Sequence, residues 1–414
     1  MKVLFVNTND LYGGATRAAM RIMRSVQRNG VNVQMFVKNK FSQSTDVVGL
    51  SRFVPYNIFY RIGDWIAEKV KNKWQHHKWS PYKRTKQDAY FSDLRSTRVN
   101  GALQKLDYDI VHLHWINHRF LDINELQKIK KPIVWTLHDS WPFTGICHVL
   151  YDCKMYETHC GSCPMLGSSK EKDLAYEVFE KKLAAYKDLD LHIVAPSKWI
   201  GDCAKNSTLL GQYPVHVIPN AIDTEAFHPM SQKYEHTIPI ILYGALNAAK
   251  DKNKGFKLLL MALRMLEKQG LEAQMVVFGA EKQELPMSFE HIDVTFVGYI
   301  HDNRKLAELY SEADVMVVPS YSEVFGQTAS EAMACGTPVV AFRCTGIQDV
   351  VAEGCGYLAE PYLPEDLANG IRYCIENNKD NVLGKEARES AIKRFAIDVV
   401  AKQYKELYES ISNK

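Results

Sequence analysis

Residues 313–342 read ADVMVVPSYSEVFGQTASEAMACGTPVVAF, and they contain a clear pattern of secondary structure. Its two ends are short apolar runs rich in valine, which are typical of strands buried on both faces of a parallel sheet. Between these runs there is room for a loop and a helix of about two turns. Thr328 is a helix start signal, and Gly336 followed by Pro338 is a stop signal. The stretch therefore predicts a strand–loop–helix–strand unit of an α/β fold.

Two carboxylates lie in this stretch with seven residues between them. Glu323 falls in the loop at the carboxyl end of the first strand, where open α/β sheets place ligands. Glu331 is expected in the first turn of the helix, and the backbone around Gly326 offers N–H groups that suit a phosphate. Such a site suits a nucleotide sugar, which carries hydroxyls on both sides of its phosphates. The alternative is that Thr328 and Glu331 form only a capping box and that Glu323 is a solvated loop charge.

The pattern Glu-x7-Glu, followed by Ala-Met-Ala-x-Gly-x-Pro-Val-Val-Ala, resembles the signature of the retaining family 4 glycosyltransferases. This resemblance implies the GT-B architecture, in which two Rossmann-like parallel-sheet domains face each other across a cleft. It also implies that Glu331 holds the ribose hydroxyls of the donor and that Glu323 contacts the transferred sugar. The backbone near Gly326, Gln327 and Thr328 would hold the diphosphate.

The composition is that of a globular protein with more than one core. The chain has 414 residues, 46% of them hydrophobic, so two or three domains are expected. A formal net charge of +3 is too small to indicate a nucleic-acid partner. The nine cysteines, an odd number, and a start that runs directly into an apolar strand favour a reducing, cytoplasmic setting. No stretch of ~18 apolar residues is present, so no membrane-spanning helix is expected.

The first βαβ unit contains a glycine pair. Strands are expected at Val3–Asn7 and Val31–Val37, with a helix at Ala15–Gln27 between them. Gly13 and Gly14 precede this helix, where they either let backbone approach a phosphate closely or form only a turn. The resembling family carries a Gly-Gly-Ala stretch here that faces the donor phosphate and the acceptor, so Gly14 is a candidate donor contact.

Two histidines share one face of the strand expected at Asp109–Trp115. His112 and His114 either form part of a metal site or make local hydrogen bonds at the end of the strand. In the resembling family the end of this strand faces the acceptor pocket. His114 is therefore a candidate acceptor contact.

Another histidine follows the strand expected at Pro132–Leu137. The sequence Thr136-x-His138-Asp139 matches the resembling family, in which this histidine faces the sugar being transferred. Its use would be a hydrogen bond near the reacting centre, adjusted by Asp139. His138 is thus a catalytic candidate together with Glu323, and Asp139 is a candidate acceptor contact. The alternative for His138 is a purely structural histidine.

A cysteine cluster follows within 17 residues. In a reducing compartment such clustering suggests a metal more than disulfides, and the first hypothesis is a structural zinc held by Cys147, Cys153, Cys160 and Cys163. The alternatives are a site with one histidine ligand, an iron–sulfur cluster, or free thiols in an acceptor-side loop. Similar loops occur in a subgroup of bacterial polysaccharide glycosyltransferases for capsule, exopolysaccharide or O-antigen. The resemblance implies that no metal is required for the chemistry.

The domain boundary is expected near Gly211, just before a segment that resembles the family's inter-domain Val-Ile-Pro-Asn-Gly-Ile-Asp. It separates an acceptor-binding domain, residues 1–211, from a nucleotide-sugar domain, residues 212–395. A last helix is expected from Lys385 onward. In the GT-B architecture its final part, about 396–414, packs back on the first domain.

The second domain departs from the family where cations usually hold the donor diphosphate. Lys254-Gly255 keeps the family's Lys-Gly pair, but Ala245 stands where arginine is usual. Lys250 and Lys252 are candidates to supply the missing charge. Lys254 is the predicted diphosphate contact, and the alternative for each lysine is a solvated charge.

Residues 61–87 combine basic side chains with tryptophan and tyrosine. This composition fits either a peripheral contact with an anionic membrane surface or a solvated helical excursion whose aromatic side chains pack inward. A membrane contact would suit an acceptor sugar carried on a lipid.

The residues and the resemblance together predict a retaining hexosyltransferase. It would move a sugar from a UDP- or GDP-linked donor to a saccharide or lipid-linked oligosaccharide acceptor, at the inner face of a bacterial plasma membrane, in surface polysaccharide biosynthesis. Two alternatives stay open: a sugar-nucleotide epimerase of similar fold, and a non-catalytic sugar-nucleotide or polysaccharide-binding protein. Kinases and dehydrogenases are disfavoured because neither a Walker phosphate loop nor Gly-x-Gly-x-x-Gly is present.

Overall fold

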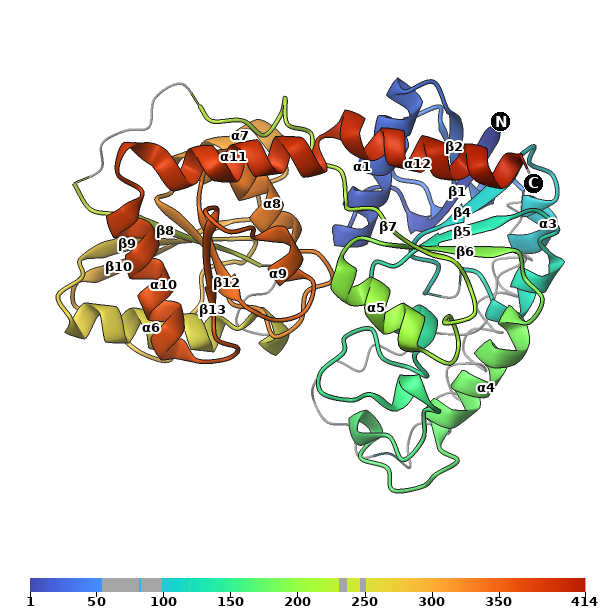
Figure 1. Ribbon diagram of the computed structural model, residues 1–414, viewed down its shortest axis with the longest axis horizontal. Coiled ribbons are helices and arrows are strands. Elements are labelled where there is room, and N and C mark those ends of the chain that lie inside the picture. Colours follow the sequence, from blue (N-terminus) through green and yellow to red (C-terminus); the bar gives the residue numbers. More distant parts are fainter. Residues whose placement is uncertain (54–81, 83–98, 119, 231–236, 246–250, 414) are drawn as a thin grey trace. The chain divides into compact units, whose positions relative to one another are not determined.

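The computed structural model describes residues 1–53, 82, 99–118, 120–230, 237–245 and 251–413 (Figure 1). The basic, aromatic segment 61–87, apart from Tyr82, lies outside these residues, and so does Lys250. The chain forms two compact units. The first contains residues 1–195, 200–217 and 402–414, and the second contains residues 196–199 and 218–401.

A seven-stranded parallel sheet forms the first unit, in the order β3-β2-β1-β4-β5-β6-β7. Its strands are β1 (Lys2–Asn9), β2 (Asn32–Asn39), β3 (Val47–Gly49), β4 (Ile110–Leu113), β5 (Ile133–Thr136), β6 (Leu191–Ala195) and β7 (Val215–Val217). Because the strand order reverses between β1 and β4, their carboxyl ends are where such a sheet binds ligands. The predicted strands at this point are confirmed.

Helices cover both faces of the first sheet. They are α1 (Gly14–Arg28), α3 (Val99–Leu103), α4 (Leu174–Tyr186), α5 (Lys198–Asn206) and the end of α12 (Ile397–Ser412). Trp135 of β5 packs against Tyr186 of α4, with ring centroids 5.9 Å apart. On the other face, the hydroxyls of Tyr408 and Tyr404 of α12 hydrogen-bond His112 at 2.7 Å and Thr136 at 3.1 Å. The last helix therefore completes the core of the first unit.

A six-stranded parallel sheet forms the second unit, in the order β10-β9-β8-β11-β12-β13. Its strands are β8 (Ile240–Gly244), β9 (Ala273–Phe278), β10 (Ile292–Gly298), β11 (Val315–Val318), β12 (Val339–Phe342) and β13 (Gly356–Ala359). Here the order reverses between β8 and β11. The strand–loop–helix–strand unit predicted for residues 313–342 is confirmed as β11, α8 (Gln327–Ala334) and β12.

The second sheet is covered on both faces (Figure 1). Its helices are α6 (Phe256–Lys268), α7 (Asn303–Glu312), α8, α9 (Ile347–Val350), α10 (Pro364–Asn377) and α11 (Val382–Phe395). Alternate residues of β8 enter two separate cores, with Ile240 and Leu242 in one and Ile241 and Tyr243 in the other. The first core is closed by α7, α8 and α11, and the second by α6 and α10. Burial on both faces explains why these strands read as continuous apolar runs.

The single helix expected from Lys385 onward is wrong, because the chain forms two helices there. Between α11 and α12, Ala396 is extended, with φ −55° and ψ 145°. Ala396 forms an isolated parallel bridge with Ile222, whose N–H donates to the carbonyl of Phe395 at 2.8 Å. The break is thus made by tertiary pairing and not by a local stop signal.

The first unit extends to Val217, somewhat beyond the boundary placed near Gly211. The reason is β7, which pairs with β6 through Val215 and Val217 and so belongs to the first sheet. Short 3-10 turns complete the description: η1 (Leu50–Arg52), η2 (Ile123–Lys128), η3 (Trp141–Phe143), η4 (Met155–Glu157), η5 (Pro164–Leu166), η6 (Lys252–Lys254) and η7 (Lys379–Asn381).

Candidate functional site

An ion pair lies at the carboxyl edge of the second sheet, where the strand order reverses. Lys254 Nζ donates to Glu323 Oε1 at 2.6 Å, and Ser320 Oγ donates to the same oxygen at 3.0 Å. The side chains of Lys254 and Glu323 are 28% and 18% exposed. Burial alone would lower the pKa of Lys254, but the carboxylate of Glu323 raises it above its usual value. The site therefore carries a fixed cation directly beside a carboxylate.

The loop that carries Glu323 is held by two neighbouring segments. The side-chain amide of Asn253, in η6, donates to the carbonyl of Ser322 at 2.8 Å and accepts from its N–H at 3.1 Å. On the other side, the N–H of Glu323 donates to Thr345 Oγ1 at 3.0 Å, and its carbonyl accepts from the N–H of Gly346 at 2.8 Å. These contacts fix the backbone on both sides of the carboxylate.

Two glycines are required by their surroundings. Gly255 has φ +66°, and a Cβ there would lie 1.8 Å from the carbonyl oxygen of Pro319. Gly326 has φ +92°, and a Cβ there would lie 2.2 Å from Ile347 Cδ1. Because L residues rarely adopt such φ values, glycine at these positions allows η6 to approach Pro319 closely and α9 to approach the start of α8 closely.

The helix after this loop begins earlier than predicted. Its N-cap is Gly326 and α8 starts at Gln327, so Thr328 lies inside the helix and forms no capping box with Glu331. The N–H groups of Gln327 and Thr328 belong to the first turn, where an α-helix offers them no intrahelical acceptor. The expectation that Glu331 lies in the first turn is wrong, because it is the fifth residue of α8.

Glu331 is buried, with 3% exposure. Its Oε2 accepts a hydrogen bond from the hydroxyl of Tyr310, in α7, at 2.9 Å. The sequence-predicted residues of this unit therefore form one connected loop and helix. Lys254 and Glu323 are in direct contact, whereas the carboxyl group of Glu331 meets α7.

The other predicted cations contribute less to the described site. Lys252 is exposed in η6. Ala245 is buried just after β8, and its N–H donates to the carbonyl of Phe278 at 3.2 Å. Lys254, which was predicted to contact the diphosphate, therefore lies directly against Glu323.

In the first unit, the glycine pair lies at the start of α1. Gly13 is the N-cap with φ +96°, and Gly14 is the first residue of this 15-residue helix. A Cβ added at either glycine would meet no atom of the described residues within 4 Å. This open space at a helix N-terminus is compatible with the donor contact predicted for Gly14.

Three histidines lie together at the end of β4 and β5. His112 is fully buried, and Nδ1 and Nε2 of its ring contact the hydroxyls of Tyr408 and Thr136, both at 2.7 Å. His114 Nδ1 lies 2.9 Å from His138 Nε2, and these two rings stack. Burial lowers the pKa of His112 and His114 well below the usual histidine value, and that of His138 to about 4. The local hydrogen bonds expected as one alternative for His112 and His114 are present.

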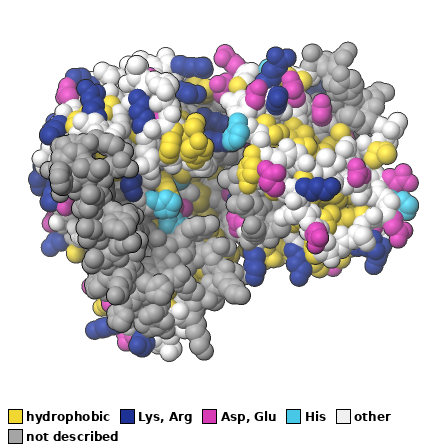
Figure 2. Space-filling view, turned by 180° about the vertical axis from the view of Figure 1, so that it is seen from behind, with side chains coloured by type: hydrophobic (Ala, Val, Ile, Leu, Met, Phe, Trp, Pro, Cys, Tyr) yellow, Lys and Arg dark blue, Asp and Glu magenta, His cyan; other side chains and the backbone are white. Residues whose placement is uncertain are grey.

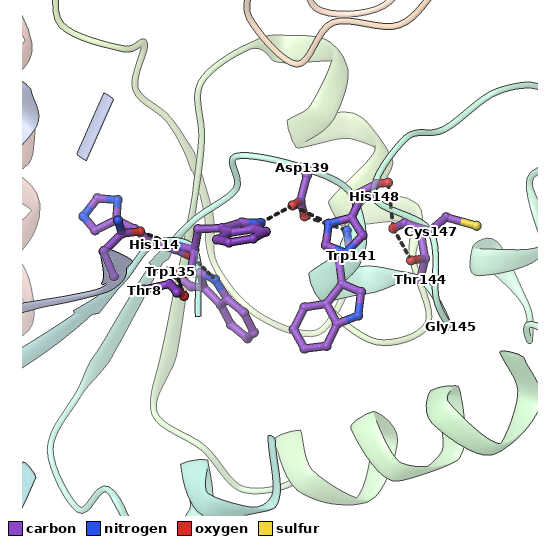
Figure 3. A network of polar contacts seen from close by, with 12 residues as sticks. Thr8, His114, Trp135, Asp139, Trp141, Thr144, Gly145, Cys147 and His148 are labelled. Atoms are coloured by element: carbon purple, nitrogen blue, oxygen red, sulfur yellow. Dashed lines mark hydrogen bonds and ion pairs between the residues drawn. The ribbon is translucent and has the colours of Figure 1, made fainter. Parts of the chain in front are cut away.

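Asp139 is the centre of a hydrogen-bond network (Figure 3). Its Oδ2 accepts from Trp115 Nε1 at 3.0 Å and from His148 Nδ1 at 2.7 Å, and its Oδ1 accepts from the N–H of Trp141 at 2.9 Å. Burial alone would raise the pKa of Asp139, but His148 and the other donors hold it below its usual value. The carboxylate thereby joins the end of β4 to the loop that follows β5.

A buried lysine of α4 holds the loop that follows β5. Lys182 of α4 is fully buried, and its ammonium group donates to the carbonyls of Trp141, Thr144 and Gly145 and lies 3.7 Å from the centroid of a Trp141 ring. Burial lowers the pKa of Lys182 well below its usual value. This residue fixes the backbone that follows Asp139.

The four cysteines lie in the segment after this loop, and all are free thiols. The N–H of Gly145 donates to Cys160 Sγ at 3.2 Å, and burial raises the pKa of the Cys160 thiol to about 11. Burial raises the pKa of the Cys147 thiol, and the proximity of Cys163, Cys160 and Cys153 raises it further, so the four lie near one another. Within the described part of the chain, however, no three His, Cys, Asp or Glu side chains are arranged as metal ligands.

On the view in Figure 2, Lys and Arg side chains are mixed with Asp and Glu over the described surface of the second unit, on the right of that picture. Among the described helices, none combines the length and the apolar character needed to cross a bilayer.

Several residues of the site were not found from the sequence. Asn253, Thr345 and Tyr310 act through contacts between segments distant in the chain, for which the sequence has no local signal. Lys182 did have a signal, because it interrupts the apolar stripe that Val178, Phe179 and Ala185 form on α4.

Two family models match the chain in succession. The model described as Glycosyltransferase Family 4 matches residues 12–226, and the model described as Glycosyl transferases group 1 matches residues 224–390. The chain belongs to glycosyltransferase family 4. The two matches together span residues 12–390 of this family 4 protein, which include all the described strands of both sheets except β1.

The relatives of this family 4 protein carry different names. It is 27% identical over 274 residues to the "Putative colanic acid biosynthesis glycosyl transferase WcaC" of Escherichia coli, covering 63% of this chain and 64% of that protein. It is 26% identical over 343 residues to the phosphatidyl-myo-inositol mannosyltransferase of Mycobacterium leprae, covering 80% and 81%. The solved structure of Anabaena Alr3699/HepE in complex with UDP and glucose superposes with a TM-score of 0.62 at 17% identity, covering 99% and 100%. This similarity identifies the GT-B fold expected from the sequence.

Proposed function

We propose that this family 4 glycosyltransferase moves a hexose from a UDP- or GDP-linked donor to a saccharide acceptor with retention of the anomeric configuration. The observation that carries this proposal is the contact of Lys254 with Glu323 beside the N-terminus of α8. A cation and a carboxylate beside the N-terminus of a helix match a ligand with a diphosphate joined to a sugar.

Each group has a role on the donor. Lys254 and the first turn of α8, at Gln327 and Thr328, hold the diphosphate and stabilise its negative charge as the bond to the sugar breaks. Glu323 binds hydroxyls of the transferred sugar, and Glu331 those of the ribose, as in the resembling family. The acceptor hydroxyl attacks on the face from which the diphosphate departs, and its proton passes to the departing diphosphate oxygen as the bond between sugar and diphosphate breaks. No metal is needed for this step in the resembling family.

The acceptor side belongs to the first unit. Gly14 faces the donor phosphate, His138 the transferred sugar, and His114 and Asp139 the acceptor. A lipid-linked oligosaccharide is the proposed acceptor, at the inner face of the plasma membrane in surface polysaccharide synthesis. The names of the relatives support this choice, since one is assigned to colanic acid biosynthesis and the other to transfer of mannose to a lipid.

The test is a thermal-shift screen of the purified full chain against UDP-, GDP- and ADP-sugars, repeated with Glu331→Ala. Glu376→Ala, an exposed substitution on α10, is the matched control. We expect one nucleotide to raise the Tm of the native protein and of the control, and to raise that of Glu331→Ala much less. A flat response to every donor, in folded protein, would exclude the nucleotide-sugar site.

Turnover with the identified donor then separates the alternatives. NMR of the product should show the anomeric configuration of the donor, and an inverted product would contradict retention. Conversion of the donor sugar without an acceptor would indicate an epimerase. Binding without hydrolysis or transfer across a panel of saccharide acceptors would indicate a binding protein.

A further inference from the structure

The contact between His114 and His138 involves a single proton. His114 Nδ1 and His138 Nε2 are 2.9 Å apart, and the ring centroids are 5.2 Å apart with an interplanar angle of 25°. Two neutral imidazoles can form this hydrogen bond only if one ring donates and the other accepts. The choice of donor decides where the second nitrogen of His138 carries its proton.

Both rings are neutral at physiological pH. Burial holds the pKa of His114 well below the usual histidine value, and His112 and His138 lower it further. Burial lowers the pKa of His138 to about 4, against a smaller raising effect of Asp139. Each ring therefore carries one proton, on one of its two nitrogens.

The surroundings of His114 distinguish the two arrangements. Its Nε2 is buried and has no hydrogen-bond partner among the described residues. The ring lies between Phe5, at a centroid distance of 4.7 Å, and His112, at 4.2 Å, and both nitrogens of His112 already contact hydroxyls. The backbone is fixed as well, since Trp135 Nε1 donates to the carbonyl of His114 at 3.1 Å (Figure 3).

If His138 donated, His114 would carry its proton on Nε2, as a buried N–H without an acceptor. If His114 donates from Nδ1, the same position holds only a lone pair. Buried N–H groups without a partner are rarer in proteins than acceptors without a donor. The second arrangement is therefore favoured.

We propose that His114 is a positioning residue that donates from Nδ1 to His138 and so holds His138 as its Nδ1–H tautomer. His138 then presents a hydrogen-bond donor, and not an acceptor, at the ring nitrogen that does not face His114. This inference rests on the proposed function in one respect, namely that His138 meets the transferred sugar. The group that it meets there must be an oxygen that accepts a hydrogen bond.

The tautomer can be measured without substrate. Two-bond ¹H–¹⁵N spectra of the full chain labelled at histidine distinguish protonated from unprotonated ring nitrogens, and the signals lost in His138→Gln identify His138. We expect the proton of His138 on Nδ1 in the native protein. In His114→Leu we expect a mixture with the Nε2–H form. A proton on Nε2 of His138 in the native protein would overturn the proposal.

Amide substitutions give a second test, because the amide of asparagine lies near the position of Nδ1 and that of glutamine near Nε2. We expect His138→Asn to retain at least tenfold more kcat than His138→Gln. Likewise His114→Leu, which removes the donor toward His138, should lower kcat by tenfold or more. The reverse order for the two His138 variants, or a native kcat in His114→Leu, among variants with native-like Tm, would overturn the proposal.

The proposed function and the tautomer of His138 can be refuted separately. A protein with His138 in the Nδ1–H form that transfers no sugar would refute the proposed function and leave the assignment of His114 intact. A competent transferase with the other tautomer would do the opposite.

Discussion

Glu323→Gln should bind nucleoside diphosphate more tightly while transferring sugar more slowly. In the structure Lys254 already has an anionic partner, Glu323 Oε1 at 2.6 Å, so an incoming diphosphate competes with that carboxylate for the same ammonium group. Glutamine keeps the size of the side chain and an oxygen that accepts from Ser320, but it removes the charge. Transfer should fall because the carboxylate no longer binds the sugar.

The size of the effect follows from the exposure of the pair. At 28% and 18% exposure, it lies between a surface pair, worth about 0–1 kcal/mol, and a buried one, whose disruption costs about 3–5 kcal/mol. We expect the contact with Glu323 to reduce the binding free energy of the diphosphate by about 1–2 kcal/mol. Glu323→Gln should therefore bind UDP or GDP with a Kd lower than that of the native protein by a factor of about 5–30.

The same substitution should change how the stability of the protein depends on pH. Glu323 raises the pKa of Lys254 in the folded protein, so the pair stabilises the fold below the lysine pKa of the unfolded chain, and this stabilisation is lost as the pH rises through the folded value. The native protein should therefore unfold at a higher Tm than Glu323→Gln at neutral pH. The difference should shrink above about pH 10.5.

Isothermal titration calorimetry with UDP and GDP measures the affinity. Glu376→Gln on α10 controls for loss of a negative charge elsewhere, and Lys254→Met should weaken binding of both nucleotides by about tenfold or more. An unchanged or higher Kd in folded Glu323→Gln would refute the reasoning, because it would mean that Lys254 does not receive the diphosphate.

Three further predictions concern the supports of the two sites. Lys182→Met leaves three buried carbonyls without the donor that Lys182 provides. It should lower the free energy of unfolding, measured by urea titration, by about 2–4 kcal/mol. A loss below about 0.5 kcal/mol would contradict the role of this lysine. Gly346→Ala places a Cβ 2.0 Å from a carbonyl oxygen of the Glu323 loop and should lower transfer at least tenfold, while Gly101→Ala, which meets no described atom within 4 Å, should not. For the cysteine segment we propose a structural zinc that gathers the four thiols, which lie near one another but are not arranged as metal ligands among the described residues. Elemental analysis should then find about one zinc per chain, with loss of metal and a lower Tm in Cys160→Ser and Cys163→Ser; metal-free protein with a native Tm would reject it.

The sequence predicts the second unit well because its elements have local causes. The valine runs of β11 and β12 are buried on both faces, and Gly336 and Pro338 end the helix between them. The start of α8 was misplaced because Thr328 is a strong N-cap type, whereas the observed N-cap, Gly326, depends on a positive φ that the sequence does not reveal. The error moved Glu331 from the second turn to the first.

Contacts between distant segments account for what the sequence did not predict. His114 and His138 meet because β4 and β5 pair in register, and Asn253 reaches the Glu323 loop because η6 follows β8, the neighbour of β11. The break at Ala396 has the same kind of origin, since its partner is Ile222. In each case the sequence shows which residue is present, but its contact partner is known only from the fold.

The position of α12 has a consequence for the order in which this protein folds during synthesis. The first sheet is complete once Val217 has left the ribosome, yet the tyrosines that cover His112 and Thr136 belong to residues 402–414. At common translation rates the second unit takes about 10–40 s to be made. During that time the face of the first sheet that α12 covers is exposed. We expect chaperones to find the largest exposed surface of the first unit at this stage.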